Sequence, residues 1–255
     1  MDRKRVGLAL GGGAARGLAH IGVLQVLERE QVVPDCIAGT SVGSLVGGAY
    51  AARIRGEDLE RMAREMRWRK IARPALSRYG LASFAKLETW MVDTAGDLTF
   101  ADLEIPFAAV AADLETGQPV ILREGRLAPA VRASCSVPGF VIPLELNGRL
   151  LTDGGVANNL PISVAREMGA DVVIAVDLML PLGRRPKGLL EIGISAIRYL
   201  IARAGDDPAT ADVHIGIPLW GIGSLLRISA GSWLIALGRQ AAEEALPDIR
   251  AALAG

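Results

Sequence analysis

The first two apolar runs of this chain each lead directly into a glycine cluster and then into a helix-forming segment. Val6–Leu10 is followed by residues 11–17 (Gly-Gly-Gly-Ala-Ala-Arg-Gly), and a run from Cys36 is followed by residues 39–43 (Gly-Thr-Ser-Val-Gly). A buried strand that turns sharply into a helix is the unit of a parallel sheet, because the helix carries the chain back to the edge where the strand began. We therefore expect both glycine clusters to lie at one edge of one sheet.

The same alternation of strands and helices continues along the chain. Further strands are predicted at 106–112, 119–122, 141–146, 149–152, 171–176 and 213–217, and helices at 18–33, 45–54 and 162–168. Asn147-Gly148 is typical of a two-residue β-hairpin turn. These elements predict a single three-layer α/β/α domain over residues 1–255, with a mostly parallel central sheet and helices on both faces. Its core motifs fall within 6–178, and the helical part at 189–255 adds the last strand.

Ser41 lies at the centre of the second glycine cluster. Gly39, Ser41 and Gly43 form a Gly-x-Ser-x-Gly pattern between an apolar strand and a helix of small residues. This pattern is typical of a strand-to-helix turn that presents the serine hydroxyl at the sheet edge, where a Cβ on either glycine would clash. The alternative is a plain glycine-rich connection, but the flanking strand and helix favour a nucleophile.

The first glycine cluster has two competing interpretations, because a glycine run at a helix N-terminus presents backbone N–H groups to an anion. A dinucleotide-binding loop requires an acidic residue at the end of the second strand to hold the ribose. This chain has Ser41 at that place. An oxyanion hole requires a nucleophile on the neighbouring strand end, which Ser41 supplies. The oxyanion hole is therefore the favoured interpretation.

Asp153 is the candidate base. An Asp-Gly pair is usually a turn, but Asn147-Gly148 already closes the hairpin, so Asp153 falls where the returning strand ends. The glycines at 154 and 155 leave room for its carboxylate to approach another segment.

The two histidines are weaker candidates. His20 falls within the first helix, where we expect it to pack or to brace the glycine loop. His214 is the histidine that fits the Ser, Asp, His order of α/β-hydrolases. The serine turn of those enzymes follows several strands, whereas here it follows the second. A triad through His214 is therefore kept as the less favoured alternative.

The ordered set of motifs resembles the bacterial patatin-like phospholipase family. The resemblance covers Val6 to Leu178 and includes residues 132–139 and 158–161. It implies a Ser–Asp dyad without a catalytic histidine, which Ser41 and Asp153 would form, and it implies no metal and no cofactor. It also implies an oxyanion hole at Gly12, Gly13 and Ala14, with Arg16 bracing the loop. Ala14 departs from the family, where many members have another glycine.

The predicted function is therefore hydrolysis of carboxylic ester bonds of lipids through an acyl-Ser41 intermediate, with Asp153 as general base. The same dyad would also serve an acyltransferase or a thioesterase. A third alternative, from a different class, is a non-catalytic lipid-binding regulatory protein.

Charge and hydropathy bear on partners and location. Acidic and basic residues balance at 28 each, so no overall field favours nucleic acid. A basic stretch between Arg64 and Arg78, with Trp68 and Tyr79, predicts peripheral contact with anionic lipid headgroups, and an ordinary solvated helix face is the equally weighted alternative. The N-terminal apolar run is too short for a signal peptide, and no stretch is long and apolar enough to span a bilayer. A soluble, cytoplasmic protein is expected.

Three further features complete the expectations. Cys36 and Cys135 lie in apolar or small-residue surroundings, which is typical of buried free thiols. Residues 181–188 are rich in Pro, Gly and basic side chains and are the candidate linker. An apolar segment around 220–233 is expected to pack in the core, to form a dimer interface, or to border an acyl-chain pocket.

Overall fold

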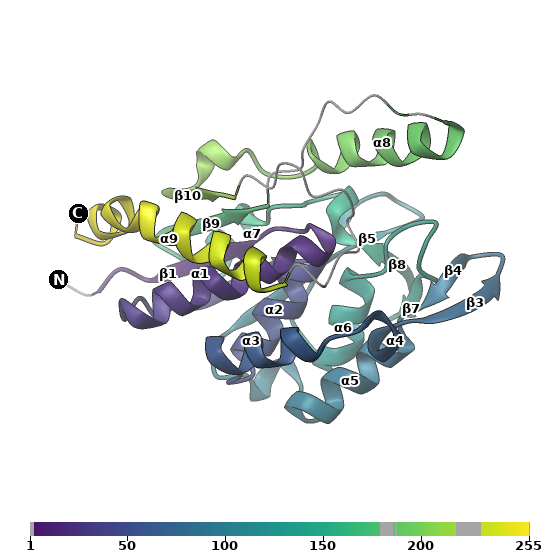
Figure 1. The fold of residues 1–255 in the computed structure, drawn as a ribbon, viewed down its shortest axis with the longest axis horizontal. Coiled ribbons are helices and arrows are strands. Elements are labelled where there is room, and N and C mark those ends of the chain that lie inside the picture. The colour runs from purple at the N-terminus through teal and green to yellow at the C-terminus, as the bar shows by residue number, and fades with distance from the viewer. Residues whose placement is uncertain (1–2, 179–185, 187, 218–230, 255) are drawn as a thin grey trace.

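The computed structural model describes residues 3–178, 186, 188–217 and 231–254 (Figure 1). The candidate linker at 181–188 lies almost entirely outside the described residues, as does most of the apolar segment at 220–233.

The central element is an eight-stranded sheet of order β10-β9-β1-β2-β5-β8-β7, in which β6 also pairs with β5. The parallel strands are β1 (Val6–Leu10), β2 (Cys36–Thr40), β5 (Phe107–Asp113), β9 (Val172–Asp177) and β10 (Val213–Gly216). The antiparallel strands are β6 (Pro119–Leu122), β7 (Leu144–Leu146) and β8 (Arg149–Asp153). The predicted mostly parallel sheet is confirmed, and the strand predicted at 213–217 joins it as β10.

Helices cover both faces of this sheet, because side chains along each strand alternate between the faces. Leu8, Leu10 and Ile37 point into the larger core, and Ala9 and Cys36 point into the smaller one. The larger core is covered by α1 (Leu18–Arg29), α2 (Val42–Ala51), α6 (Leu127–Ser134) and α9 (Gly231–Ala254). The smaller core is covered by α7 (Ile162–Glu167). The predicted three-layer arrangement is confirmed.

Small residues on the α7 side allow that helix to approach the sheet closely. A Cβ on Gly7 would lie 2.5 Å from the Cβ of Ala170, and Cys36 is buried in the same layer. Cys36 and Cys135 are both buried free thiols. The predicted free thiols are thus confirmed.

The remaining elements lie around the sheet. Between α2 and β5 the chain forms α3 (Gly56–Glu65), α4 (Trp68–Ile71), the hairpin of β3 (Arg73–Ser77) and β4 (Gly80–Ser83), and α5 (Ala85–Ala95). Helix α8 (Leu189–Ile201) follows β9 and precedes β10 in the chain. Short 3₁₀ turns are η1 (Ala14–Gly17), η2 (Phe100–Asp102), η3 (Gly154–Val156) and η4 (Pro208–Thr210).

The basic stretch at 64–78 is therefore not one helix face. It passes from the end of α3 through α4 into the β3–β4 hairpin, which projects from the end of the molecule opposite the two chain termini (Figure 1). Among the helices in the described ranges, none is both long and apolar enough to cross a membrane.

Candidate active site

Ser41 lies at the sharp turn between β2 and α2. Its backbone has φ 55° and ψ −123°, a conformation that residues with a Cβ rarely adopt. Ser41 is also the N-cap of α2, so the positive end of the helix dipole lies next to its side chain. A residue held in such a strained conformation at a helix N-terminus is typical of a functional site.

The glycines on both sides of Ser41 allow three backbone segments to meet. A Cβ on Gly39 would lie 2.5 Å from the carbonyl oxygen of Gly43, and a Cβ on Gly43 would lie 2.1 Å from that of Leu10. Both are far inside van der Waals contact. The prediction that any Cβ beside Ser41 would clash is confirmed.

We expect Gly43→Ala to lower the free energy of unfolding by about 3 kcal/mol or to prevent folding, because the overlap is with rigid backbone. Gly193→Ala is the matched control, since Gly193 is exposed in α8 and a Cβ there would meet nothing within 4 Å. The control should gain up to about 1 kcal/mol from better helix propensity. Urea unfolding of both variants measures this, and equal stability of the two would contradict the described packing.

Asp153 meets Ser41 at the sheet edge. It is the last residue of β8, which pairs with β5, and β5 pairs with β2. Ser41 Oγ donates a 2.6 Å hydrogen bond to Asp153 Oδ2, and the backbone N–H of Gly155 donates a 2.8 Å bond to Oδ1. A Cβ on Gly154 would lie 2.2 Å from the Val110 carbonyl oxygen, so glycine is required where the chain leaves Asp153.

Burial controls the acidity of Asp153. The side chain is removed from water, and this desolvation raises its pKa from 3.8 to about 6, against the opposing hydrogen bonds from Ser41 and Gly155. The carboxylate is therefore ionised at neutral pH, yet it is a stronger base than an exposed aspartate. A base with a pKa close to the working pH is suited to accept the proton of a serine hydroxyl.

The glycine loop lies against Ser41. A Cβ on Gly12 would lie 3.4 Å from the Cβ of Ser41. The Gly11 N–H donates to the Val176 carbonyl at 3.0 Å, and the Gly12 N–H donates to the Asn159 carbonyl at 3.1 Å. The Gly12 N–H is thus already committed, contrary to the expectation that it faces an oxyanion.

The next two N–H groups of the loop differ. Within the described ranges, neither Gly13 nor Ala14 donates a backbone hydrogen bond. Ala14 has φ 54°, so it adopts the left-handed conformation that a glycine would take with less strain. The departure of this chain from the family pattern at position 14 is therefore accommodated in the fold.

Arg16 and His20 each form a hydrogen bond to a backbone carbonyl of the glycine loop. Arg16 is buried, and its Nε donates to the Gly13 carbonyl at 3.1 Å. His20 Nε2 lies 2.8 Å from the Gly11 carbonyl oxygen and must carry the proton of that bond, since a carbonyl only accepts. Burial lowers the His20 pKa to about 4, so the ring is neutral. His20 therefore braces the loop, as its sequence position suggested.

A further group of hydrogen bonds fixes the turn around Ser41. The Ser41 N–H donates to Ser134 Oγ at 2.8 Å, and Ser134 Oγ donates to the Val110 carbonyl at 2.5 Å. Thr40 Oγ1 donates to the Asn158 carbonyl at 2.8 Å. Sequence reasoning assigned no role to Ser134 or Asn158, and their inclusion in the family-like segments 132–139 and 158–161 was the available signal.

Asp206 anchors this group from the C-terminal part of the chain. Its Oδ2 accepts hydrogen bonds from Asn158 Nδ2 at 3.1 Å, Ser163 N at 2.7 Å and Ser163 Oγ at 2.8 Å. Asn159 N also donates to the Ala204 carbonyl at 3.1 Å. No sequence signal pointed to Asp206, because it lies about fifty residues from its partners, beyond the recognisable motifs.

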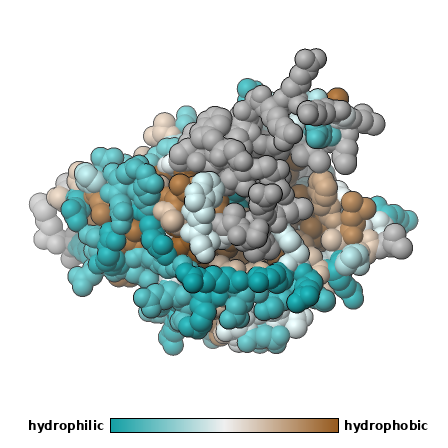
Figure 2. Space-filling view, in the orientation of Figure 1, coloured by the Kyte–Doolittle hydropathy of each residue, from teal (hydrophilic) through white to brown (hydrophobic). Residues whose placement is uncertain are grey.

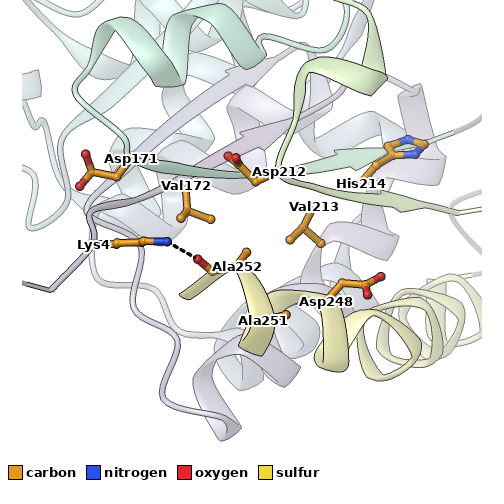
Figure 3. Close-up of a pocket in the computed structure, with 9 residues that line it drawn as sticks. All are labelled: Lys4, Asp171, Val172, Asp212, Val213, His214, Asp248, Ala251 and Ala252. Atoms are coloured by element: carbon orange, nitrogen blue, oxygen red, sulfur yellow. Dashed lines mark hydrogen bonds between the residues drawn. The ribbon is translucent and has the colours of Figure 1, made fainter. Parts of the chain in front are cut away.

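His214 does not reach the dyad. It lies on β10, three strands from β2 in the sheet order, and its Nε2 is 3.5 Å from Asp177 Oδ2. It borders a pocket at the opposite edge of the sheet, where β9 and β10 begin (Figure 3). Lys4 Nζ donates there to the Ala252 carbonyl at 2.9 Å. This pocket contains neither member of the dyad, and a triad through His214 has no geometric support.

In the part of the chain that the structure describes, no three His, Cys, Asp or Glu side chains are placed to hold a metal ion.

Comparison with known proteins places these features in a family context. A family model described as patatin-like phospholipase matches residues 8–166. An uncharacterized NTE family protein of Mycobacterium tuberculosis is 41% identical over 177 residues, which cover 68% of this chain and 49% of that protein. Patatin-like phospholipase domain-containing protein 6 of Homo sapiens is 37% identical over 186 residues, covering 68% of this chain and 13% of the human protein. The chain thus spans about half the length of the mycobacterial relative.

Solved structures share the fold at low sequence identity. VipD from Legionella pneumophila superimposes with a TM-score of 0.56 and 12% identity, covering 96% of this chain and 67% of that chain. ExoU of Pseudomonas aeruginosa, in its heterodimeric complex with SpcU, gives a TM-score of 0.53 and 12% identity, covering 99% of this chain and 52% of that chain.

Proposed function

This chain belongs to the patatin-like phospholipase family, and on that premise we propose that it is a serine acyl hydrolase that cleaves carboxylic ester bonds of lipids. The observation that carries the proposal is the 2.6 Å hydrogen bond from Ser41 Oγ to Asp153 Oδ2, made at a strained turn beside the glycine loop. A hydroxyl that donates to a buried carboxylate is prepared to lose its proton to that base as it attacks.

The first half-reaction forms an acyl-enzyme. Ser41 Oγ attacks the ester carbonyl carbon while Asp153 takes the hydroxyl proton, and the carbonyl oxygen becomes an oxyanion. The N–H groups of Gly13 and Ala14, together with the N-terminal end of α2, stabilise that charge. Gly12 shapes the hole, since its own N–H binds Asn159, and Arg16 braces the loop through the Gly13 carbonyl. The alcohol then leaves with the proton held by Asp153.

The second half-reaction regenerates the enzyme. Asp153, again a carboxylate, takes a proton from water as the water oxygen attacks the acyl-Ser41 carbonyl carbon. Collapse of the second tetrahedral intermediate releases the carboxylic acid and returns the proton to Ser41 Oγ. The residues of this chain therefore supply the nucleophile, the base and the oxyanion donors.

The alternatives share the site but differ in the acceptor or in the chemistry. An acyltransferase would deliver the acyl group to an alcohol, and a thioesterase would release a thiol. A non-catalytic lipid-binding protein would have no chemical requirement for a Ser41 hydroxyl hydrogen-bonded to a buried carboxylate.

We expect the protein to hydrolyse p-nitrophenyl esters of short and medium chain length, and phospholipid esters, with release of free acid. Product analysis in the presence of a glycerol acceptor separates hydrolysis from transfer. Acyl glycerol as the main product would replace the hydrolase by an acyltransferase. Inactivity of the folded protein on all of these esters, and on acyl thioesters, would favour the lipid-binding protein.

A further inference from the structure

Positive charge is concentrated in one short part of this chain. Residues 66–87 contain six basic residues and no Asp or Glu, although the whole chain has 28 residues of each sign. Five of these cations belong to α4 and the β3–β4 hairpin or flank them, and all five are exposed: Arg67, Arg69, Lys70, Arg73 and Arg78. In the part of the chain that the structure describes, none of the five forms an ion pair with a carboxylate.

Large apolar side chains lie exposed beside these cations. Leu81 is 67% exposed, Tyr79 53% and Phe140 40%, which is unusual for neighbouring side chains of this size. The Arg78 guanidinium lies 4.7 Å from the centre of the Tyr79 ring and donates to its hydroxyl group. Figure 2 shows hydrophobic and hydrophilic residues side by side at the end of the molecule where Figure 1 places the hairpin. We call these five cations and three apolar residues the basic hairpin surface.

The basic hairpin surface is hydrogen-bonded to residues 136–142, a segment that also contacts Asp153. The backbone N–H groups of Leu81 and Ala82 donate to the Phe140 carbonyl at 3.0 and 2.9 Å, and Ile142 N donates to the Ala82 carbonyl at 2.9 Å. Phe140 closely follows Ser136, whose carbonyl oxygen accepts a 2.9 Å bond from Asp153 N. The surface and the dyad are therefore linked through a short, hydrogen-bonded stretch of chain.

The surface also faces the end of the molecule where Ser41 lies. Strand β1 begins near the N-terminus and runs away from it, so the carboxyl ends of the parallel strands point away from the termini (Figure 1). The hairpin projects from that far end, and Ser41 follows the carboxyl end of β2. A lipid surface bound at the hairpin would therefore contact the molecule at the end that carries the dyad.

We infer that the basic hairpin surface docks this protein on an anionic lipid bilayer. Exposed arginines and a lysine attract acidic headgroups, while a tyrosine in contact with Arg78 and an exposed leucine and phenylalanine suit the boundary between headgroups and acyl chains. Nucleic acid would explain the cations but not the apolar side chains beside them. The inference deepens the proposed function, because it names the surface that brings the dyad to its substrate.

Sedimentation with vesicles tests the inference. The wild type should bind vesicles of equal parts phosphatidylglycerol and phosphatidylcholine at low salt, and bind pure phosphatidylcholine weakly. The triple variant R69Q/K70Q/R73Q should lose on the order of a hundredfold in vesicle partitioning, at about fivefold for each cation. The control R29Q/R53Q/R250Q removes three exposed cations that pair elsewhere on the molecule and should bind as the wild type does.

Further arms separate the possible outcomes. Both triple variants should hydrolyse a short soluble ester at the wild-type rate, whereas R69Q/K70Q/R73Q should be slow on vesicles. Leu81→Ser should weaken vesicle binding and leave soluble-ester hydrolysis unchanged.

Failure of the wild type to bind the anionic vesicles, or an equal loss in both triple variants, would overturn the docking surface. Tighter binding to duplex DNA than to vesicles, unaffected by Leu81→Ser, would assign it to nucleic acid. Vesicle binding by a protein without esterase activity would leave the surface and remove the proposed function.

Discussion

Ser41→Ala is expected to lower ester hydrolysis by on the order of 10⁴–10⁶-fold, because the acyl-enzyme cannot form without the hydroxyl. The fold should persist, since Ser41 contributes only its backbone N–H to the hydrogen bond with Ser134 Oγ. Initial rates on a p-nitrophenyl ester, with circular dichroism to confirm folding, provide the measurement.

His214→Ala is the matched control for Ser41→Ala. Its side chain lies three strands from β2, so activity should stay within about twofold of the wild type, as for other surface changes distant from the site. A folded Ser41→Ala protein that keeps its activity would remove Ser41 as the nucleophile. A large loss in folded His214→Ala would restore the triad that the geometry disfavours.

Asp153→Asn should lower kcat/KM by about 10²–10⁴-fold, because an amide cannot accept the serine proton. In the wild type, kcat/KM should rise with pH as Asp153 ionises, with an apparent pKa near the value of about 6 that burial produces. The remaining activity of Asp153→Asn should lack this acid limb. A wild-type profile that is flat through this range would contradict Asp153 as the base.

The same substitution should stabilise the protein, which separates its chemical role from a structural one. The folded pKa of Asp153 is raised from 3.8 to about 6, so the folded state favours the protonated form, and this contribution is lost as pH rises through about 6. Ionised Asp153 therefore destabilises the fold by roughly 3 kcal/mol above that pH. Asp153→Asn should unfold at higher urea than the wild type there, and the difference should disappear towards pH 4. An Asp153→Asn protein that is less stable at high pH would show that the carboxylate holds the fold together.

Much of the architecture could be predicted because it depends on local patterns. The runs at 6–10 and 172–176 are continuously apolar, as buried parallel strands require. The turn at Ser41 could be predicted because only glycine on both sides allows the backbone to approach so closely. The position of Asp153 at a strand end could be predicted because Asn147-Gly148 forms the hairpin turn, so Asp153 is not itself the turn residue.

The remainder depends on contacts between segments distant in the chain, which leave little local signature. Asp206 meets Asn158 and Ser163 only when the segment after α8 folds back on the loop that follows Asp153. The β3–β4 hairpin lies within a stretch whose charge pattern suggests a solvated helix, whereas its Leu81 and Ala82 N–H groups donate to the carbonyl of Phe140, far along the chain. The hydrogen bond from the Gly12 N–H to the Asn159 carbonyl likewise joins segments that are distant in the chain, so no local pattern predicts it.

The central claim is that Ser41 is a nucleophile activated by Asp153 without a histidine. The most direct measurement is labelling with a fluorophosphonate, which reacts with activated serines, followed by peptide mass spectrometry. We predict one phosphonyl group on the peptide that contains Ser41, formed at a normal rate in His214→Ala, far more slowly in Asp153→Asn and not at all in Ser41→Ala. Label on a different residue, or equal labelling of Ser41 in Asp153→Asn and the wild type, would contradict the dyad.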